Sequence, residues 1–152
     1  MSLLSIKHEN FNIVLDSDYS YLNANFASAV GSITVDSISN FAINQIIIIG
    51  QLGSEDAEII KTHASTTPTG NTITLASNTT KAHNRGTKIS IINFDKYELS
   101  HATSLTGAKT VLITSTGNGL VSIDQERTIT LYNDVEYNSG YYFIRPINSI
   151  GA

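Results

Sequence analysis

Four histidines, at positions 8, 63, 83 and 101, are the residues of this chain best suited to acid–base chemistry or metal binding. No two of them stand at H-x-x-x-H or a comparable spacing, which would place two imidazoles on one metal ion. The chain has no cysteine, so thiolate ligands and disulfides are excluded. His83, in the Ala-His-Asn-Arg-Gly segment, is the one histidine singled out as a candidate ligand or base. Because no partner stands near it in sequence, we interpret it as a loop residue whose ring hydrogen-bonds a turn.

Close carboxylate pairs are the second candidate, at Asp16 and Asp18 and at Glu55, Asp56 and Glu58. Calcium binds through such oxygens, but the twelve-residue calcium loop pattern is missing. Solvated turn charges are therefore the preferred interpretation. No serine stands in a Gly-x-Ser-x-Gly elbow, and no glycine-rich loop could cradle a phosphate. The sequence thus predicts no catalytic residue, no cofactor-binding or metal site, and no enzyme activity.

Composition narrows the class of protein further. Charged residues make up 14% of the 152 residues, against roughly 25% in typical soluble domains, and Ser, Thr and Asn replace them. The net charge of −4 does not favour binding to nucleic acid or to an anionic membrane. No apolar run reaches the length of a membrane span, and the N-terminus does not have the pattern of a secretory signal. We expect synthesis in a cytoplasm, with one domain or two small ones.

The elements that would position these residues are short strands. Apolar runs rich in Ile, Val and Thr are each bounded by Gly, Asn, Ser or Pro, which is typical of β-structure. Residues 31–97 are expected to form a small β-barrel-like module of five strands, whose closure would hide the strand edges. Residues 1–30 are expected to form an N-terminal arm, or to contain a short helix over residues 19–30. The fold class predicted is all-β.

Residues 98–152 are expected to form a second module, a β-sandwich. Five further strand candidates follow one another there, and aromatic residues gather toward the end of the chain. The boundary near residue 97 has no linker composition, so we expect the two modules to pack together.

Several segments together resemble a module of virion structural proteins in tailed bacteriophages. The segments are GSITVDSISNF, the IIIIG turn, LGSEDAEIIK, NTITLAS and KAHNRGT. The segments DKYELSHAT, KTVLITS and YYFIRPINS that follow are similar to a fibronectin-type-III-like domain. The resemblance covers about residues 31–149. It implies a component of a phage particle and does not indicate the position within it.

Function is expected to follow from that resemblance. The first expectation is a capsid decoration (cement) protein located in the virion, with the major capsid protein or another virion protein as partner. Low charge and a possible N-terminal arm suit a homo-oligomer, and a trimer is favoured. A tail or neck component is the alternative within this class. A carbohydrate- or receptor-binding sandwich is the other alternative, with Tyr132, Tyr137, Tyr141 and Tyr142 as stacking platforms.

Glu58 carries the most specific structural prediction. It stands inside an otherwise apolar strand, and it must either face solvent or find a hydrogen-bond donor, because a buried carboxylate without a partner is too costly. In the resembled pattern an acidic strand residue and the Ala-His loop occur together, which makes His83 and Arg85 the nearest donors. We therefore predict that Glu58 contacts the loop at residues 83–86 and that this contact has a structural role.

Overall fold

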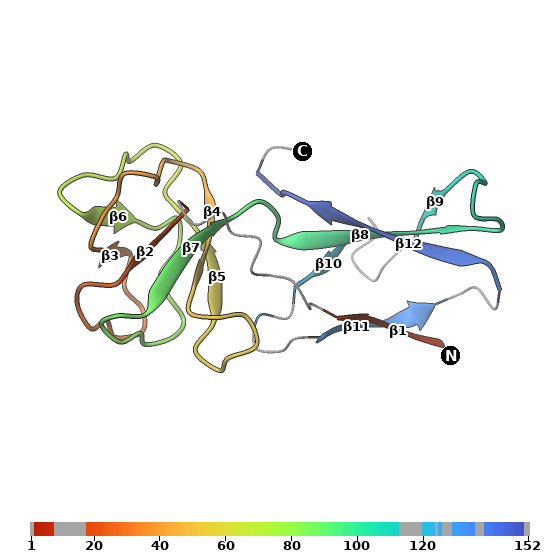
Figure 1. Cartoon of the computed structure of the whole chain (residues 1–152), viewed down its shortest axis with the longest axis horizontal. Coiled ribbons are helices and arrows are strands. Elements are labelled where there is room, and N and C mark those ends of the chain that lie inside the picture. Colours follow the sequence, from red (N-terminus) through yellow and green to blue (C-terminus); the bar gives the residue numbers. More distant parts are fainter. Residues whose placement is uncertain are drawn as a thin grey trace. The chain divides into compact units, whose positions relative to one another are not determined.

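The fold is seen in a computed structural model that describes residues 2–7, 18–112, 120–123, 125, 129–135 and 139–150. Within these residues the chain forms antiparallel strands and no helix, so the all-β prediction is confirmed (Figure 1). The strands are β1 Ser2–Lys7, β2 Tyr19–Tyr21, β3 Ser32–Thr34, β4 Ile46–Ile49, β5 Glu58–Lys61, β6 Thr72–Thr74, β7 Lys88–Ile92, β8 Lys96–Ala102, β9 Thr110–Val111, β10 Leu120–Ser122, β11 Ile129–Val135 and β12 Tyr141–Ile147.

The strands belong to two compact units. Unit 1 contains β1 and β8–β12, and unit 2 contains β2–β7 together with Gln125. Along the chain, the change from unit 2 to unit 1 falls between Asn93 and Phe94. The residues of the expected N-terminal arm are divided between the two units. β1 pairs with β11 in unit 1, β2 pairs with β7 in unit 2, and residues 1 and 8–17 lie outside the described part.

Unit 2 consists of a four-stranded sheet in the order β2-β7-β4-β5 and a two-stranded sheet, β3-β6. Neither sheet closes on itself, so the closed five-stranded barrel expected from the sequence is not formed. Isolated bridges join the sheets at both edges instead. Thr62 pairs with Leu75 at the β5 side, and Leu22 pairs with Val35 at the β2 side. The unit is therefore barrel-like, with hydrogen bonding that passes round the core through single bridges.

Isoleucine forms the centre of this core. β4 lies between β5 and β7, and its four isoleucines are all buried. Ile47 and Ile49 belong to the hydrophobic core cluster of the unit, together with Ile33, Ile73 and Ile89. A continuous apolar run is what a strand covered on both faces requires. Burial of each such side chain contributes about 1.5–3 kcal/mol.

The short helix considered for residues 19–30 is not formed, and that prediction was wrong. Leu22 and Phe26 make β-bridges with Val35 and His83, and Ala29 has a positive φ of 65°. The backbone amides of this segment donate to Thr87, His83 and Thr79 instead of to residues four positions earlier. Leu22 is buried in the core cluster, and Phe26 and Val30 pack against it. The apolar residues of this segment have helical spacing, but they reach the core from an irregular extended backbone.

Both ends of the β5 edge are covered by other backbone or side-chain groups. The Gln125 side-chain oxygen accepts from the Ile59 amide at 2.7 Å, and its backbone oxygen accepts from the Gly53 amide at 3.0 Å. The Lys61 carbonyl accepts from the Ala76 amide at 2.8 Å. An unpaired strand edge is a template for pairing with other chains. Unit 2 protects this edge with groups of its own.

Unit 1 contains a sheet in the order β10-β8-β12, with β9 also paired to β8, and the two-stranded sheet β1-β11. The central strand β8 supplies the buried side chains Tyr97, Leu99 and His101 on one face. The connection to β12 bends at Gly140, whose φ is +113°. There the His101 ring nitrogen Nε2 lies 2.7 Å from the Ser139 carbonyl oxygen.

Candidate functional site

Glu58 lies on β5 opposite Ile49 and faces the core of unit 2. Its side chain is only 4% exposed, and that of His83 is fully buried. Carboxylate Oε1 accepts hydrogen bonds from the Thr80 amide at 2.7 Å and from the Thr80 hydroxyl at 2.9 Å. Oε2 lies 3.0 Å from His83 Nε2. The predicted contact between Glu58 and the loop at residues 83–86 is therefore confirmed. We call Glu58, Thr80 and His83 the Glu58 cluster.

The backbone around His83 is held from a third segment. His83 and Phe26 exchange two backbone hydrogen bonds, of 2.9 and 2.8 Å. After the loop turns, the Gly86 amide donates to the Leu22 carbonyl at 2.7 Å. Gly86 has a φ of +83°, which glycine adopts without steric cost. The Glu58 cluster thus ties β5, the loop at residues 79–86 and the segment at residues 22–30 to one another.

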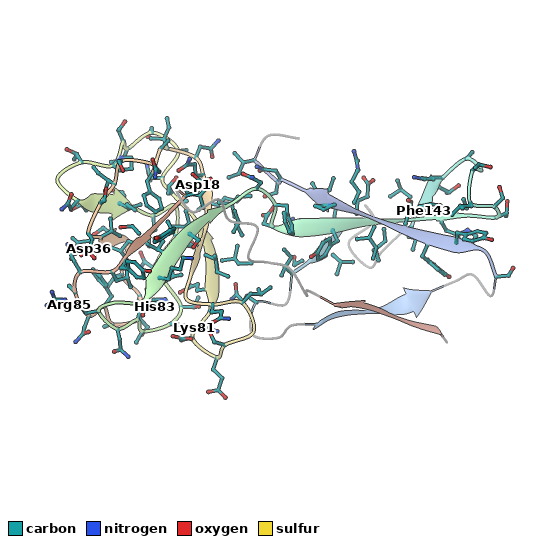
Figure 2. All side chains as sticks on the ribbon, in the orientation of Figure 1. Asp18, Asp36, Lys81, His83, Arg85 and Phe143 are labelled. Carbon is teal, nitrogen blue, oxygen red and sulfur yellow. The ribbon has the colours of Figure 1, made fainter. Side chains whose placement is uncertain are left out.

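Two neighbouring residues of the loop behave differently from His83 (Figure 2). The Lys81 ammonium donates to the backbone carbonyls of Glu55 and Ala57, at 2.6 and 3.0 Å, and so fastens the loop to the hairpin before β5. The Arg85 side chain is exposed, and its backbone amide donates to the Asn25 side chain at 2.7 Å. Of the two donors named from the sequence, His83 is the one that bonds Glu58.

Opposing effects set the charge of the Glu58 cluster. Burial by itself raises the pKa of the Glu58 carboxyl. Hydrogen bonds from the Thr80 amide, the His83 ring, the Thr80 hydroxyl and the Lys81 amide outweigh burial and hold that pKa below its ordinary value of 4.5. A carboxylate only accepts hydrogen bonds, so His83 Nε2 carries the hydrogen of this pair. Within the described residues His83 Nδ1 is buried without a hydrogen-bond partner.

Thr80 is the member of the cluster that sequence reasoning missed. It supplies two of the hydrogen bonds to Glu58, one from its amide and one from its hydroxyl. The available signal was the Thr-Thr pair just before Lys81-Ala-His, because a threonine hydroxyl is a hydrogen-bond donor that is common in turns. Polar residues are so frequent in this chain that such a pair did not stand out.

The remaining candidates do not come together in the described part of the chain. His63 accepts from the amide and hydroxyl of Thr66, at 3.1 and 2.9 Å, within its own turn. His101 is buried in unit 1, and His8 and Asp16 lie outside the described residues. Glu55 and Asp56 are exposed. No group of three or more potential metal ligands is found among the described side chains.

Among the candidate stacking platforms, Tyr141 is exposed, whereas Tyr142 packs edge-on against His101 with ring centroids 5.3 Å apart. The side chains of Tyr132 and Tyr137 lie outside the described set. Tyr21 of β2 is also exposed, but it meets Tyr19 edge to face. Among the described residues, each unit therefore has one exposed tyrosine on which a sugar ring could stack.

Comparison of the chain with models of protein families, with curated proteins and with solved structures gives no match. In the part of the chain that the structure describes, no helix has the length and apolar character to cross a membrane. Function is therefore inferred from the residues of this chain alone.

The Glu58 cluster predicts how stability depends on pH. Because the pKa of Glu58 is lower in the folded chain than its ordinary value of 4.5, the carboxylate stabilises the fold above that pH. This contribution is lost as the pH falls through the lower, folded-state pKa. We expect the difference in melting temperature between the wild type and Glu58→Gln to be largest near pH 7 and to shrink toward pH 3. Glu55→Gln, at an exposed site in the same hairpin, should follow the wild type throughout. A constant difference for Glu58→Gln would contradict the prediction.

Proposed function

We propose that this chain is a non-enzymatic structural protein of a tailed-phage particle, most specifically a capsid decoration protein that binds the major capsid protein and stabilises the head. The observation that supports the proposal is that two of the resembled motifs contact each other and have a structural role. The strand EIIK and the loop KAHNRGT meet inside unit 2, where Glu58 and His83 bond each other out of contact with solvent. A buried acid–base pair of this kind holds segments together and leaves the surface to do the binding.

The surface of the described residues supports a binding role. Large apolar side chains are exposed on both units, namely Tyr21, Ile43, Leu105, Val111, Tyr141 and Ile144. Low charge and many Ser, Thr and Asn residues leave few groups that would have to be desolvated as ions when a protein surface is buried. These features favour a protein partner, such as the outer surface of a capsid shell, and assembly as a homo-oligomer.

The test is where the protein lies in a particle. Purified phage particles from the genome that encodes this chain would be labelled with gold-conjugated antibody against it and imaged by electron microscopy. Label over the heads is the expected result, and shells that lack the protein should gain thermal stability when it is added. Label confined to the neck or tail would instead support a tail component. Particles without any label, together with binding on a glycan array, would overturn the proposal in favour of a carbohydrate-binding protein.

A further inference from the structure

β12 is an edge strand, and its outer side is not covered by described groups in the way that Gln125 and Ala76 cover the outer side of β5. It pairs with β8 along all seven residues from Tyr141 to Ile147, and within the described residues no strand pairs with its other side. Tyr141 is 48% exposed and Ile144 is 41% exposed. The Arg145 side chain is exposed as well. A long edge with exposed apolar residues is a surface to which another strand can add.

The hydrogen bonds of β8 show which residues of β12 face outward. The Leu112 amide donates to the Leu99 carbonyl, so Leu99 directs its backbone groups to the β9 side of β8. Successive residues of a strand direct their backbone groups to alternate sides. The even-numbered residues of β8 therefore direct theirs to β12. Their partners are Tyr141, Phe143, Arg145 and Ile147.

The backbone groups at positions 142, 144 and 146 consequently point away from β8. Position 146 is a proline, which has no amide hydrogen to donate. Proline in a sheet is confined to edge strands with its nitrogen on the free side, and this placement agrees with the assignment. Ile144 is then the central outward residue, with both an amide and a carbonyl directed away from the sheet.

We propose that β12 pairs with β12 of a second copy of this chain, antiparallel and about a two-fold axis at Ile144. In this register Ile144 faces Ile144 of the second copy, and the two residues exchange two backbone hydrogen bonds. Pro146 has no amide hydrogen for Tyr142 of the second copy, so one hydrogen bond is missing at each end of the ladder. The contact is closed because the two-fold axis uses the same edge of both copies. The edge therefore favours a two-fold contact over the trimer expected from the sequence.

Side-chain pairs across this register are mostly apolar. Tyr141 faces Ile147 of the second copy, and Arg145 faces Phe143, whose ring already has the Lys109 ammonium of its own chain 4.1 Å from its centroid. The two Ile144 side chains meet on the axis. Glu98 of the same chain already neutralises Arg145, with two hydrogen bonds of 3.1 Å. Directly opposed pairs lie about 4.5–5.5 Å apart at Cβ, and in this register no two charged residues of β12 stand directly opposite each other.

The contact at Ile144 is tested by substitutions that place a charged side chain on the proposed two-fold axis. The molar mass of the full chain would be measured by sedimentation equilibrium over a range of concentrations. We expect a monomer–dimer equilibrium for the wild type and for the matched control Ile144→Val. Ile144→Lys places two ammonium groups opposite each other, and Ile144→Glu places two carboxylates there. Each variant alone should dissociate at least about tenfold more readily, and an equimolar mixture of the two should recover the dimer.

A second variant tests the backbone. Ile144→Pro removes the outward amide hydrogen together with the isoleucine side chain, and Pro146 shows that β12 accepts proline at an equivalent position. We expect its far-ultraviolet circular dichroism to match the wild type while its dimer is lost. A wild-type monomer at all concentrations, a trimer, or failure of the Lys and Glu variants to pair would each overturn the proposal. Because these readouts need no phage particle, they stand apart from the test of the proposed function.

Discussion

Replacing Glu58 with alanine is expected to lower the free energy of unfolding by about 3–5 kcal/mol, because removal of one partner leaves the others buried and unpaired. The Thr80 amide and hydroxyl and the His83 ring all lose their acceptor. Native domains are stable by only about 5–15 kcal/mol, so the variant should be close to unfolding at 37 °C. Urea unfolding followed by circular dichroism measures the change. Glu55→Ala, an exposed site in the same hairpin, should stay within about 0.5 kcal/mol of the wild type.

The coupling energy between Glu58 and His83 is measured by a double-mutant cycle of Glu58→Ala and His83→Ala. The two side chains share one hydrogen bond of 3.0 Å inside the core, so their effects should not add. We expect a coupling energy of at least about 1 kcal/mol. Additive effects would mean that the two residues stabilise the unit independently, and the structural role given to the Glu58 cluster would be wrong.

Replacing Gly140 with alanine should destabilise unit 1 by about 3 kcal/mol or more. Its φ of +113° is one that L side chains rarely adopt, and such strain costs about 1–3 kcal/mol. An added Cβ would also overlap His101 Nε2 and lie 2.7 Å from the Ala102 carbonyl oxygen. The overlap would push the His101 ring away from the Ser139 carbonyl, to which it is bonded. Thermal unfolding measures the loss.

Gly70→Ala is the matched control for this second prediction. Gly70 also has a positive φ, of +55°, but nothing lies within 4 Å of an added Cβ. Its substitution should cost only the conformational term, about 1–2 kcal/mol. Equal melting temperatures for the two variants would show that the turn at Gly140 does not press against His101.

The strands were predictable because they are specified locally. The four-isoleucine run that ends at Gly50 became β4, and the Glu58–Lys61 segment paired back on it as a hairpin. For Glu58 the sequence left two possibilities, exposure to solvent or a bond to a donor. The resembled pattern named His83 and Arg85 as the nearest donors, and His83 is the one that bonds Glu58.

The errors have a common cause. Leu22, Phe26 and Val30 have helical spacing, yet they reach the core from an extended segment whose amides bond residues 79–87. Periodicity reports which side chains are apolar and does not report where the backbone hydrogen bonds go. The same holds for barrel closure, since single bridges at Thr62 and Leu22 replaced a continuous ladder.

The sequence by itself determined that this protein is all-β, that its core is built on isoleucine, and that Glu58 must either face solvent or bond a donor. These properties follow from residue type and alternation, which act over a few neighbouring positions. The tertiary structure alone decided that Thr80 completes the cluster, that Gln125 covers the edge of β5 and that, among the described strands, β8 is the one that pairs with β12. Each of these depends on contacts between residues far apart in the chain, and such contacts are set by how the strands pair and not by local preference.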